Sequence, residues 1–341
     1  MKQRAHAWTA LRALKLLDDS KKAPKLVELL SYYLSDAWDG AWLPDTLIVD
    51  MSYGHIFKMD SSSVALGTDI SGNKRYVRTH KQLDKALKGK RLMLNYVKGE
   101  PTLDKPYMAH PKFGGHLPNR VIALSHSLGD MLKMSNYPMA FYAKEKKSKH
   151  YLKDLSKKSV KDLSLSPNFS ARQIAMTFFL LSHYICDAHM PLHCDLRDRM
   201  LRKTVKRRIP AKLHPSIEKI WEKQFPEKID LILHDYTKNS IDDVVAALPD
   251  DSMIMIDSVK KYSLGTSIPV ISQDEWTEMV QVCRTSYAVS RKWIAKPYKS
   301  AEEFIEDVGS EEFVEVTNRI FHDAVQCVAA IWLKAWKRYI R

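Results

Sequence analysis

The sequence of 341 residues predicts an all-α fold, which we interpret as one multi-helix domain over residues 1–341. Leu, Ala, Lys and Met are plentiful and favour helices, whereas the chain holds only 11 glycines. In several long segments the apolar residues recur every three to four positions, as they do on the buried face of an amphipathic helix. No segment alternates apolar and polar residues for long enough to predict a sheet.

The same spacing places the elements along the chain. A helical region is expected over residues 7–34, and a loop over 41–60 contains Pro44 and Gly54. A loop-rich insertion is expected near residues 60–115, although its segment 81–98 could form a basic helix. Further helices are expected over 119–133, 171–190, 215–225, 273–296 and 311–340.

Ser170 and Gln173 have the spacing of a capping box at the start of the helix expected over 171–190, and Pro191 is expected to end it. The lysine-dense segment 144–161 is interpreted as a solvated surface or loop. The aromatic residues near the end of the chain, Trp332, Trp336 and Tyr339, are interpreted as core residues.

The chain carries 54 basic and 40 acidic residues, a formal net charge of +14. Its partner is therefore expected to be anionic, and nucleic acid, an anionic membrane surface and a phosphate ester all qualify. The four cysteines form no C-x-x-C pair, which argues against a zinc ribbon or a disulfide scaffold. The sequence does not predict an oligomeric state.

No apolar run reaches the roughly 18 residues that a membrane-spanning helix needs. Met1 is followed by a basic stretch without the apolar core of a signal peptide. If the sequence is complete, a cytoplasmic location is expected. If a leader has been removed ahead of Met1, the protein is expected to be secreted or periplasmic.

The segment from His183 to His193 carries the strongest chemical signal. His183 and Asp187 are four residues apart in an apolar helix, so both side chains project from one face and could hold one cation. Because Pro191 turns the chain, His193 could reach back toward the same place. Burying these groups without a counter-charge would cost several kcal/mol, which a divalent cation would offset.

Weaker signals lie on both sides of this segment. His214 and Glu218 repeat the four-residue spacing, Asp45 is followed ten residues later by His55, and His6 precedes the first amphipathic helix. Each alone could be an ordinary surface or core residue. Together they form an ordered series of imidazoles and carboxylates along the chain.

That series resembles the superfamily of zinc-dependent phospholipase C and the single-strand-specific zinc nucleases. The match covers residues 6–218 by motif and is closest at His-x-x-x-Asp-x-x-x-x-x-His, including the Pro-Leu-His ending at 191–193. Glu218 and the Leu-Pro-Asp at 43–45 resemble the phospholipase branch, whereas the His-x-Pro-Leu-His at 189–193 resembles the nuclease branch. Cys186, Met190 and Met1 depart from the family pattern.

The resemblance implies a helical hydrolase with two or three zinc ions. It places Asp45, His55, His183 and Asp187 at the first ion and His193, His214 and Glu218 at the second. A third ion would be held by His6, Asp187 and the terminal amine of Met1. All these ligands are nitrogen or oxygen donors, which suits zinc with open positions.

The implied reaction is hydrolysis of a phosphodiester by metal-activated water. Asp45 is the candidate catalytic residue that would orient or deprotonate this water. Phospholipid headgroups and nucleic acid remain alternative substrates, and an inactive metal-bound protein that binds anionic membranes or partners is the alternative of another class. Arg207 and Arg208, in the basic segment 202–208, could contact substrate phosphate or form a solvated loop.

The remaining histidines receive more ordinary interpretations. His126 and Asp130 also lie four residues apart, but core packing or support of a ligand is favoured over ligation. His189 is expected to support the ligands from behind. Cys194 is expected to pack in the core.

Overall fold

A computed structural model of the protein describes residues 1–48, 54–59, 91–100, 116–136, 169–198, 209–225, 268–271 and 273–339. These residues are mostly helical, and within them no β-strand forms, apart from one isolated bridge between Met59 and Asp195. The expected all-α class is confirmed for this part of the chain. Among the described helices, none is both long and apolar enough to cross a bilayer.

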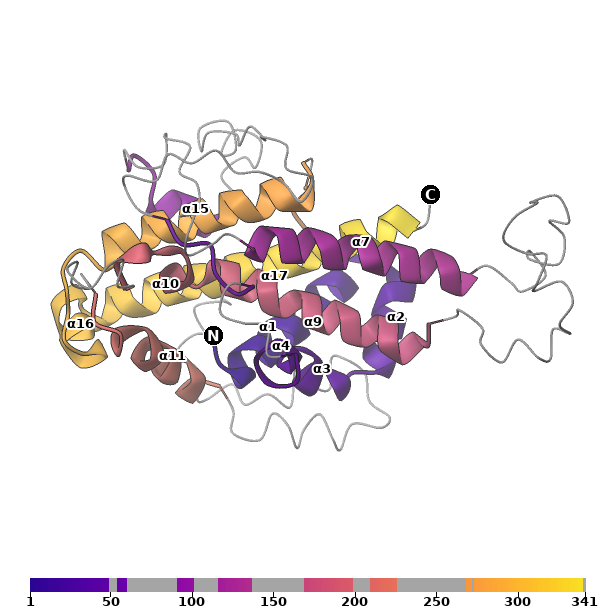
Figure 1. Ribbon diagram of the computed structural model, residues 1–341, viewed down its shortest axis with the longest axis horizontal. Helices are drawn as coiled ribbons and strands as arrows, with labels where there is room; N and C mark the ends of the chain where they lie inside the picture. Colours follow the sequence, from indigo (N-terminus) through magenta and orange to yellow (C-terminus); the bar gives the residue numbers. More distant parts are fainter. Residues whose placement is uncertain are drawn as a thin grey trace, which may run out of the picture.

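Four long helices run along the molecule and carry its core (Figure 1). They are α7 (Leu117–Asn136), α9 (Ala171–His189), α15 (Glu275–Trp293) and α17 (Ser310–Tyr339). The helices α7 and α9 pack against each other, and α15 and α17 each pack against both of them. The helix α1 (Gln3–Ser20) packs against α17 and α9. The other described elements are α2 (Pro24–Tyr32), α3 (Asp36–Gly40), α4 (Leu43–Thr46), α6 (Leu92–Tyr96), α10 (Pro191–Cys194), η3 (Leu196–Asp198), α11 (Leu213–Lys223) and α16 (Ala301–Val308).

The helix α9 begins and ends where the sequence predicts. The Ser170 hydroxyl accepts a hydrogen bond from the Gln173 amide at 3.1 Å, and the Gln173 side chain accepts one from the Ser170 amide at 2.9 Å. This is the predicted capping box. At the other end Met190 is extended and Pro191 begins α10, so the chain turns directly after His189.

The long C-terminal helix α17 belongs to the core, as its aromatic residues suggest. Trp332 is fully buried and donates its indole N–H to the carbonyl of Phe178 on α9 at 2.9 Å. Trp336 is also buried. Each such side chain contributes about 1.5–3 kcal/mol on burial. Trp332 therefore fixes α17 against α9, and both tryptophans are core residues that offer no surface for stacking bases.

A close approach brings α3 and α4 onto α9. At Gly40 an added Cβ would lie 2.7 Å from the Cβ of Phe179, so a larger residue cannot fit without displacing a helix. The chain then passes through Trp42 into α4, which packs on α9. The prediction of a loop over 41–60 is therefore wrong at Leu43–Thr46, where Pro44 occupies the first turn of a short helix instead of interrupting one.

Other predictions fall partly outside the described residues. The insertion near 60–115 and the basic helix over 81–98 are described only at 91–100, where α6 forms. Segments 144–161 and 202–208 are not described. The helix α16 was not predicted from the sequence, although Ser300 caps it through the amide of Glu303 at 3.2 Å.

Candidate metal centre

The site is organised around Asp187, which α9 presents next to His183 one turn earlier. The Asp187 Oδ2 atom lies 3.1 Å from His183 Nε2 and 2.8 Å from His55 Nδ1. Its Oδ1 atom lies 3.3 Å from His193 Nδ1 and 3.6 Å from His6 Nε2. One buried carboxylate thus faces four imidazoles that come from four separate segments of the chain.

The segment at His55 is held beside the turn after α9 by main-chain hydrogen bonds. Phe57 donates its amide hydrogen to the carbonyl of His193 at 3.2 Å, and Met59 donates to that of Cys194 at 2.9 Å. The buried Lys58 ammonium also reaches the carboxylate of Asp198 at 2.9 Å. His55 and His193 are therefore brought to the same carboxylate by one shared piece of structure.

Asp45, on α4, completes the first half of the site. Its Oδ1 atom is 3.7 Å from His55 Nδ1 and 3.7 Å from His183 Nε2. Its side chain is 29% exposed, whereas that of Asp187 is 2% exposed. Burial and the neighbouring charge of Asp187 raise the pKa of Asp45, despite the opposing effect of His183.

The helix α11 supplies the second half. His214 and Glu218 lie one turn apart, with the Nε2 and Oε1 atoms 3.0 Å from each other. Glu218 Oε1 also lies 3.7 Å from His193 Nε2. His193 therefore stands between Asp187 on one side and Glu218 on the other.

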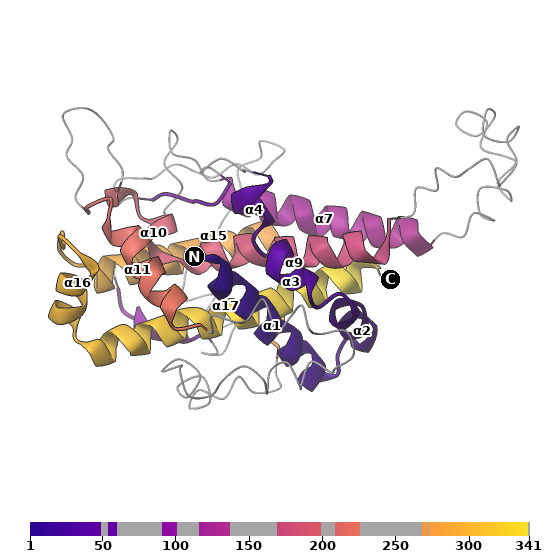
Figure 2. The same cartoon turned by 90° about the horizontal axis from the view of Figure 1, so that it is seen from below.

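The terminal amine of Met1 closes the arrangement. It lies 2.7 Å from Glu218 Oε1 and 3.2 Å from Asp187 Oδ1, and it is fully buried. Figures 1 and 2 both place the N-terminus between α11 and α9. Burial opposes the charge of this amine, but Glu218 and Asp187 outweigh it and raise the pKa to about 11.

We call this assembly the Asp187 cluster; its members are the Met1 amine, His6, Asp45, His55, His183, Asp187, His193, His214 and Glu218. Within the described residues, three groups in it have donor atoms close enough to hold a metal ion, and the first two share His183. The groups are His6, Asp45 and His183; His55, His183 and Asp187; and His193, His214 and Glu218. The structure thus brings together every predicted ligand that the sequence singled out.

The hydrogen bonds of His183 suit a ligand. Its Nδ1 atom donates to the carbonyl of Ala41 at 2.8 Å, which leaves the lone pair of Nε2 directed at Asp187 and Asp45. A carbonyl partner behind the ring fixes the tautomer and orientation of metal-binding histidines. The close approach at Gly40 positions this carbonyl, because Ala41 is the next residue in the chain.

Several buried polar atoms of the cluster lack a hydrogen-bond partner among the described residues. They are both ring nitrogens of His6 and Nδ1 of His193. Burial, and the positive groups around them, hold the pKa values of both imidazoles well below the usual range, so both rings are neutral and offer lone pairs. An unpaired buried nitrogen costs about 1–3 kcal/mol, which coordination of a cation would offset.

The carboxylates of the cluster stay ionised. Burial opposes the charge of Asp187, but His193, the Met1 amine and His183 hold its pKa well below the usual range. The pKa of Glu218 is lowered in the same way by the Met1 amine and His214, against the effect of burial. A set of anionic oxygens and neutral imidazole nitrogens is the donor set of a divalent cation site, so the residues fit a bound metal.

Glu222 fixes the N-terminal part of the site although no motif pointed to it. Its two carboxylate oxygens accept the amide hydrogens of Arg4 at 3.1 Å and Ala5 at 3.4 Å. It lies one helical turn after Glu218 on α11, so it ties the first turn of α1 to the helix that carries two predicted ligands. Its spacing of four residues from Glu218, which places both on one face of α11, is the sequence feature that could have pointed to Glu222.

Aromatic rings enclose the cluster and were also missed. The ring of Trp42 lies 5.9 Å from that of His6 and 6.1 Å from that of His183, and Tyr184 lies 5.3 Å from His55. Arg120 on α7 donates to the Tyr184 hydroxyl at 3.3 Å. Tyr184 directly follows His183 and Trp42 directly precedes Leu43, so adjacency to the predicted ligands was the available signal.

Other residues to which a role was assigned from the sequence lie away from the cluster. His126 and Asp130 are exposed, so neither core packing nor support of a ligand is correct for them; Asp130 instead lies 3.8 Å from Lys133. The Cys194 thiol is buried and donates to the Ala188 carbonyl at 3.7 Å, as a packing role requires. Arg207 and Arg208 lie outside the described residues.

His189 does not contact a ligand of the cluster through its ring. Its Nδ1 atom donates to the carbonyl of Ile185 on its own helix at 2.7 Å, and its buried Nε2 atom has no hydrogen-bond partner in the part of the chain that the structure describes. Burial lowers its pKa to about 4, and its charged neighbours are Arg91 and Asp323. The expected supporting role behind the ligands is therefore wrong.

Comparisons with protein-family models, with characterised proteins and with solved structures found no match to this chain.

Proposed function

We propose that the protein is a zinc-dependent phosphodiester hydrolase of the phospholipase C type. One observation carries this proposal: four imidazoles from four segments of the chain face the buried carboxylate of Asp187, and two further carboxylates, Asp45 and Glu218, lie 3.7 Å from imidazoles of this set. A structural role alone would not require so many unpaired or like-charged donors in one buried place. The ordered motif that resembles zinc-dependent phospholipase C and the zinc nucleases supplies the reaction class.

The residues divide into two halves that share Asp187. Asp45, His55, His183 and Asp187 would hold one ion, and His193, His214 and Glu218 a second. His6 and the Met1 amine face Oδ1 of Asp187, the oxygen that also faces His193, and a third ion would bind there. Cations bound in this way lower the pKa of a water molecule and neutralise charge that develops on phosphoryl oxygens.

Asp45 is the carboxylate best suited to handle the proton of the attacking water. It is the most exposed acidic group of the cluster, and its raised pKa makes it a stronger base than Asp187 or Glu218. Asp187 and Glu218, with lowered pKa values, would remain ionised and hold the cations. The net charge of +14 favours capture of an anionic substrate from solution.

The test combines elemental analysis with hydrolysis of phosphatidylcholine, single-stranded DNA and a chromogenic phosphodiester. We expect at least two divalent ions per chain, loss of hydrolysis on chelation and recovery with zinc. Preference for DNA would reassign the substrate to nucleic acid. Bound metal without hydrolysis of any of the three would indicate an inactive metal-binding protein, and activity that survives thorough chelation would exclude the zinc mechanism.

A further inference from the structure

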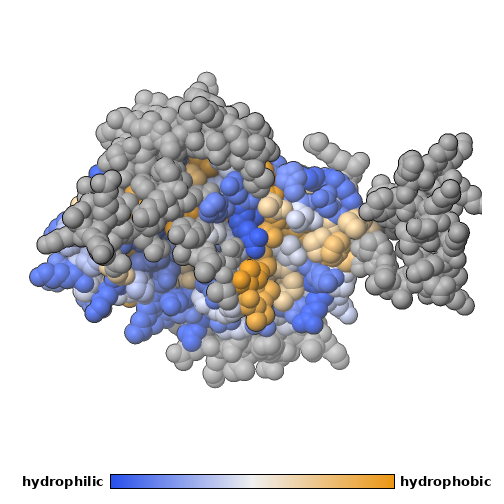
Figure 3. All heavy atoms as spheres, in the orientation of Figure 1, coloured by the Kyte–Doolittle hydropathy of each residue, from blue (hydrophilic) through white to orange (hydrophobic). Residues whose placement is uncertain are grey.

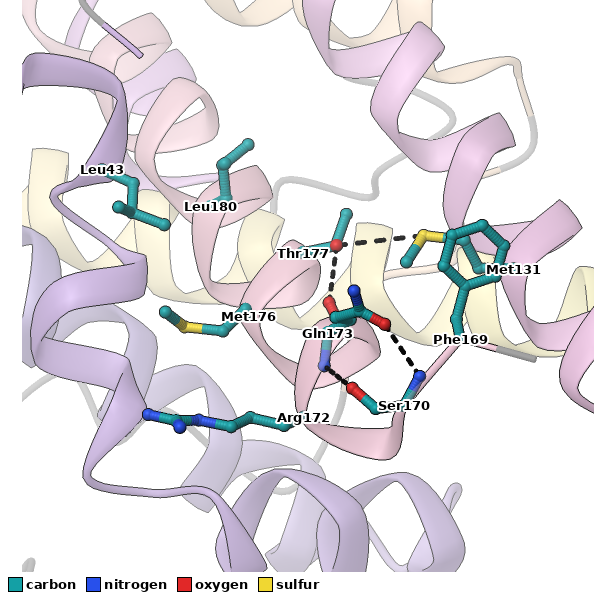
Figure 4. Close-up of a pocket in the computed structure, with 9 residues that line it drawn as sticks. All are labelled: Leu43, Met131, Phe169, Ser170, Arg172, Gln173, Met176, Thr177 and Leu180. Carbon is teal, nitrogen blue, oxygen red and sulfur yellow. Dashed lines mark hydrogen bonds between the residues drawn. The ribbon is translucent and has the colours of Figure 1, made fainter. Parts of the chain in front are cut away.

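A pocket of about 410 Å³ lies beside the Asp187 cluster, between α4, α7 and the first half of α9. Figure 4 shows Leu43 on one side, Met131 and Phe169 on the other, and Met176 and Leu180 between them. Pockets that bind small ligands have volumes of about 300–1,000 Å³ and mostly apolar linings. Size and lining both fit an apolar ligand group.

One stripe of α9 connects this pocket to the candidate metal centre. Met176, Leu180, His183 and Asp187 follow one another at intervals of four, three and four residues, so they lie on one face of the helix. Leu180 precedes His183 by about 4.5 Å along the helix axis. The short helix α4 carries Leu43 in the pocket and, two residues later, Asp45 in the cluster, so α4 and α9 each border both sites.

The polar side chains of the pocket are already engaged with neighbours. The Thr177 hydroxyl donates to the Gln173 carbonyl at 2.7 Å, and the Gln173 side chain belongs to the capping box. Arg172 makes two hydrogen bonds of 2.7 Å to Asp36. Recognition of a nucleobase or sugar needs convergent hydrogen-bonding groups. A pocket whose polar groups are engaged in this way favours hydrocarbon.

Exposed apolar residues extend the pocket outward along two of its walls. Leu47, one turn after Leu43, is 80% exposed, and Met134, one turn after Met131, is 38% exposed. On the face in Figure 3, hydrophobic surface gathers in the middle of the molecule, where Figure 1 labels α3, α4 and α9. Exposed apolar surface next to a pocket is typical of a ligand-binding groove.

We propose that this pocket binds a hydrocarbon chain of a lipid phosphodiester whose phosphate lies at the Asp187 cluster. The proposal rests on the proposed function, because only a lipid substrate would present a chain beside the phosphate. The row of residues on α9 determines how the substrate lies: its polar atoms face His183 and Asp187, and its hydrocarbon chain extends along Leu180 and Met176.

The test is binding of alkylphosphonates of six, eight, ten and twelve carbons, below their micelle concentrations, to the full chain. The C–P bond replaces the scissile ester, so the probes are not hydrolysed, and calorimetry measures affinity directly. Each buried methylene should raise the affinity about two- to four-fold. Leu180→Gln and Met176→Gln should reduce this increase per methylene to less than half.

Two further variants keep the test decisive. Ile305→Gln changes a half-buried apolar residue of α16, far from the pocket, and should retain the full chain-length dependence. Leu47→Gln changes a rim residue too exposed to affect folding, and should reduce the affinity for the longest probes most strongly. If Leu180→Gln does not fold, Leu47→Gln carries the test alone.

The outcomes separate this proposal from the proposed function. Affinity that does not change with chain length in the unmodified protein would overturn the pocket assignment even if phosphodiesters are hydrolysed. A chain-length dependence without hydrolysis would keep the pocket and remove the proposed reaction. Displacement of the probes by a dinucleotide, sensitive to Leu180→Gln, would assign the pocket to a base instead and overturn the proposal.

Discussion

Two of the buried polar regions among the described residues are built in opposite ways. In the Asp187 cluster, the ionised carboxylates of Asp187 and Glu218 lie near the neutral imidazoles of His6 and His193, and the pKa of the Met1 amine is raised so that it keeps a positive charge. The second region joins α6 to α15 and α17. We call it the Asp323 cluster; its members are Arg91, Gln273, Glu278 and Asp323.

Each carboxylate oxygen of the Asp323 cluster has a donor. Glu278 accepts from Arg91 through one oxygen and from Gln273 at 2.8 Å through the other. Asp323 accepts the amide hydrogens of Leu92 at 2.9 Å and Met93 at 2.8 Å, at the start of α6. Donors from the protein itself offset the cost of burial here, so the region needs no ion.

Two buried histidines differ in the same way: His183 belongs to the Asp187 cluster, whereas the charged neighbours of His189 are Arg91 and Asp323. His183 donates to the carbonyl of another segment and directs its second nitrogen at two carboxylates, whereas His189 donates to its own helix. Burial alone therefore does not identify a ligand. The informative feature is a nitrogen lone pair directed at carboxylates while the other nitrogen is held by a carbonyl.

The largest expected effect is at the shared carboxylate. Asp187→Asn should lose more than one bound metal ion per chain, because this carboxylate faces both halves of the site, and hydrolysis should disappear. Asp323→Asn makes the same chemical change in the other cluster, and this variant should keep the metal ions bound at the Asp187 cluster. Elemental analysis of the two variants decides: unchanged zinc in Asp187→Asn would refute the assignment of a bridging ligand.

The second effect is on stability and belongs to the Asp323 cluster. Asp323→Asn places an amide NH₂ against one of the two amide hydrogens at the start of α6. Leaving a buried donor unsatisfied should lower the free energy of unfolding by about 1–3 kcal/mol. Urea denaturation of the metal-loaded protein measures this. A midpoint equal to that of the unmodified protein would show that Asp323 does not hold α6.

A smaller effect is expected at Glu222, which positions the site without belonging to it. Glu222→Gln replaces one of the two oxygens that hold the amides of Arg4 and Ala5, so His6 and the Met1 amine should lose part of their alignment with Asp187. We expect a several-fold weaker affinity for one ion only, measured by zinc titration against a competing chelator. Glu28→Gln, an exposed change on α2, is the control. An equally weakened affinity for every bound ion would contradict a local role of Glu222.

The smallest effect concerns the basic segment 202–208. Replacing both Arg207 and Arg208 by Ala should raise KM for an anionic phosphodiester a few-fold at low salt. The difference should shrink as ionic strength rises above about 0.1 M, because screening weakens the steering of charged substrates. The charge-matched control replaces the exposed Lys22 and Lys25 by Ala. An effect that does not depend on salt would indicate direct contact or a structural change.

The sequence by itself determined the helices and the ligand series. Helix periodicity predicted α7, α9, α15 and α17 because each is long and has a continuous apolar face. Local spacing also predicted His183 with Asp187, and His214 with Glu218, because residues four apart on a helix share a face. The capping box at Ser170 and the turn at Pro191 are equally local, so they too could be predicted.

Only the tertiary structure decided which of these groups meet. The main-chain hydrogen bonds between residues 57–59 and 193–196 bring His55 to Asp187, and the close contact at Gly40 brings Ala41 and Asp45 to His183. Packing between distant segments likewise determines the contacts of Glu222, the directions of the His183 and His189 rings, and the exposure of His126. Such contacts are not encoded in spacing along one helix, because they depend on how whole helices cross.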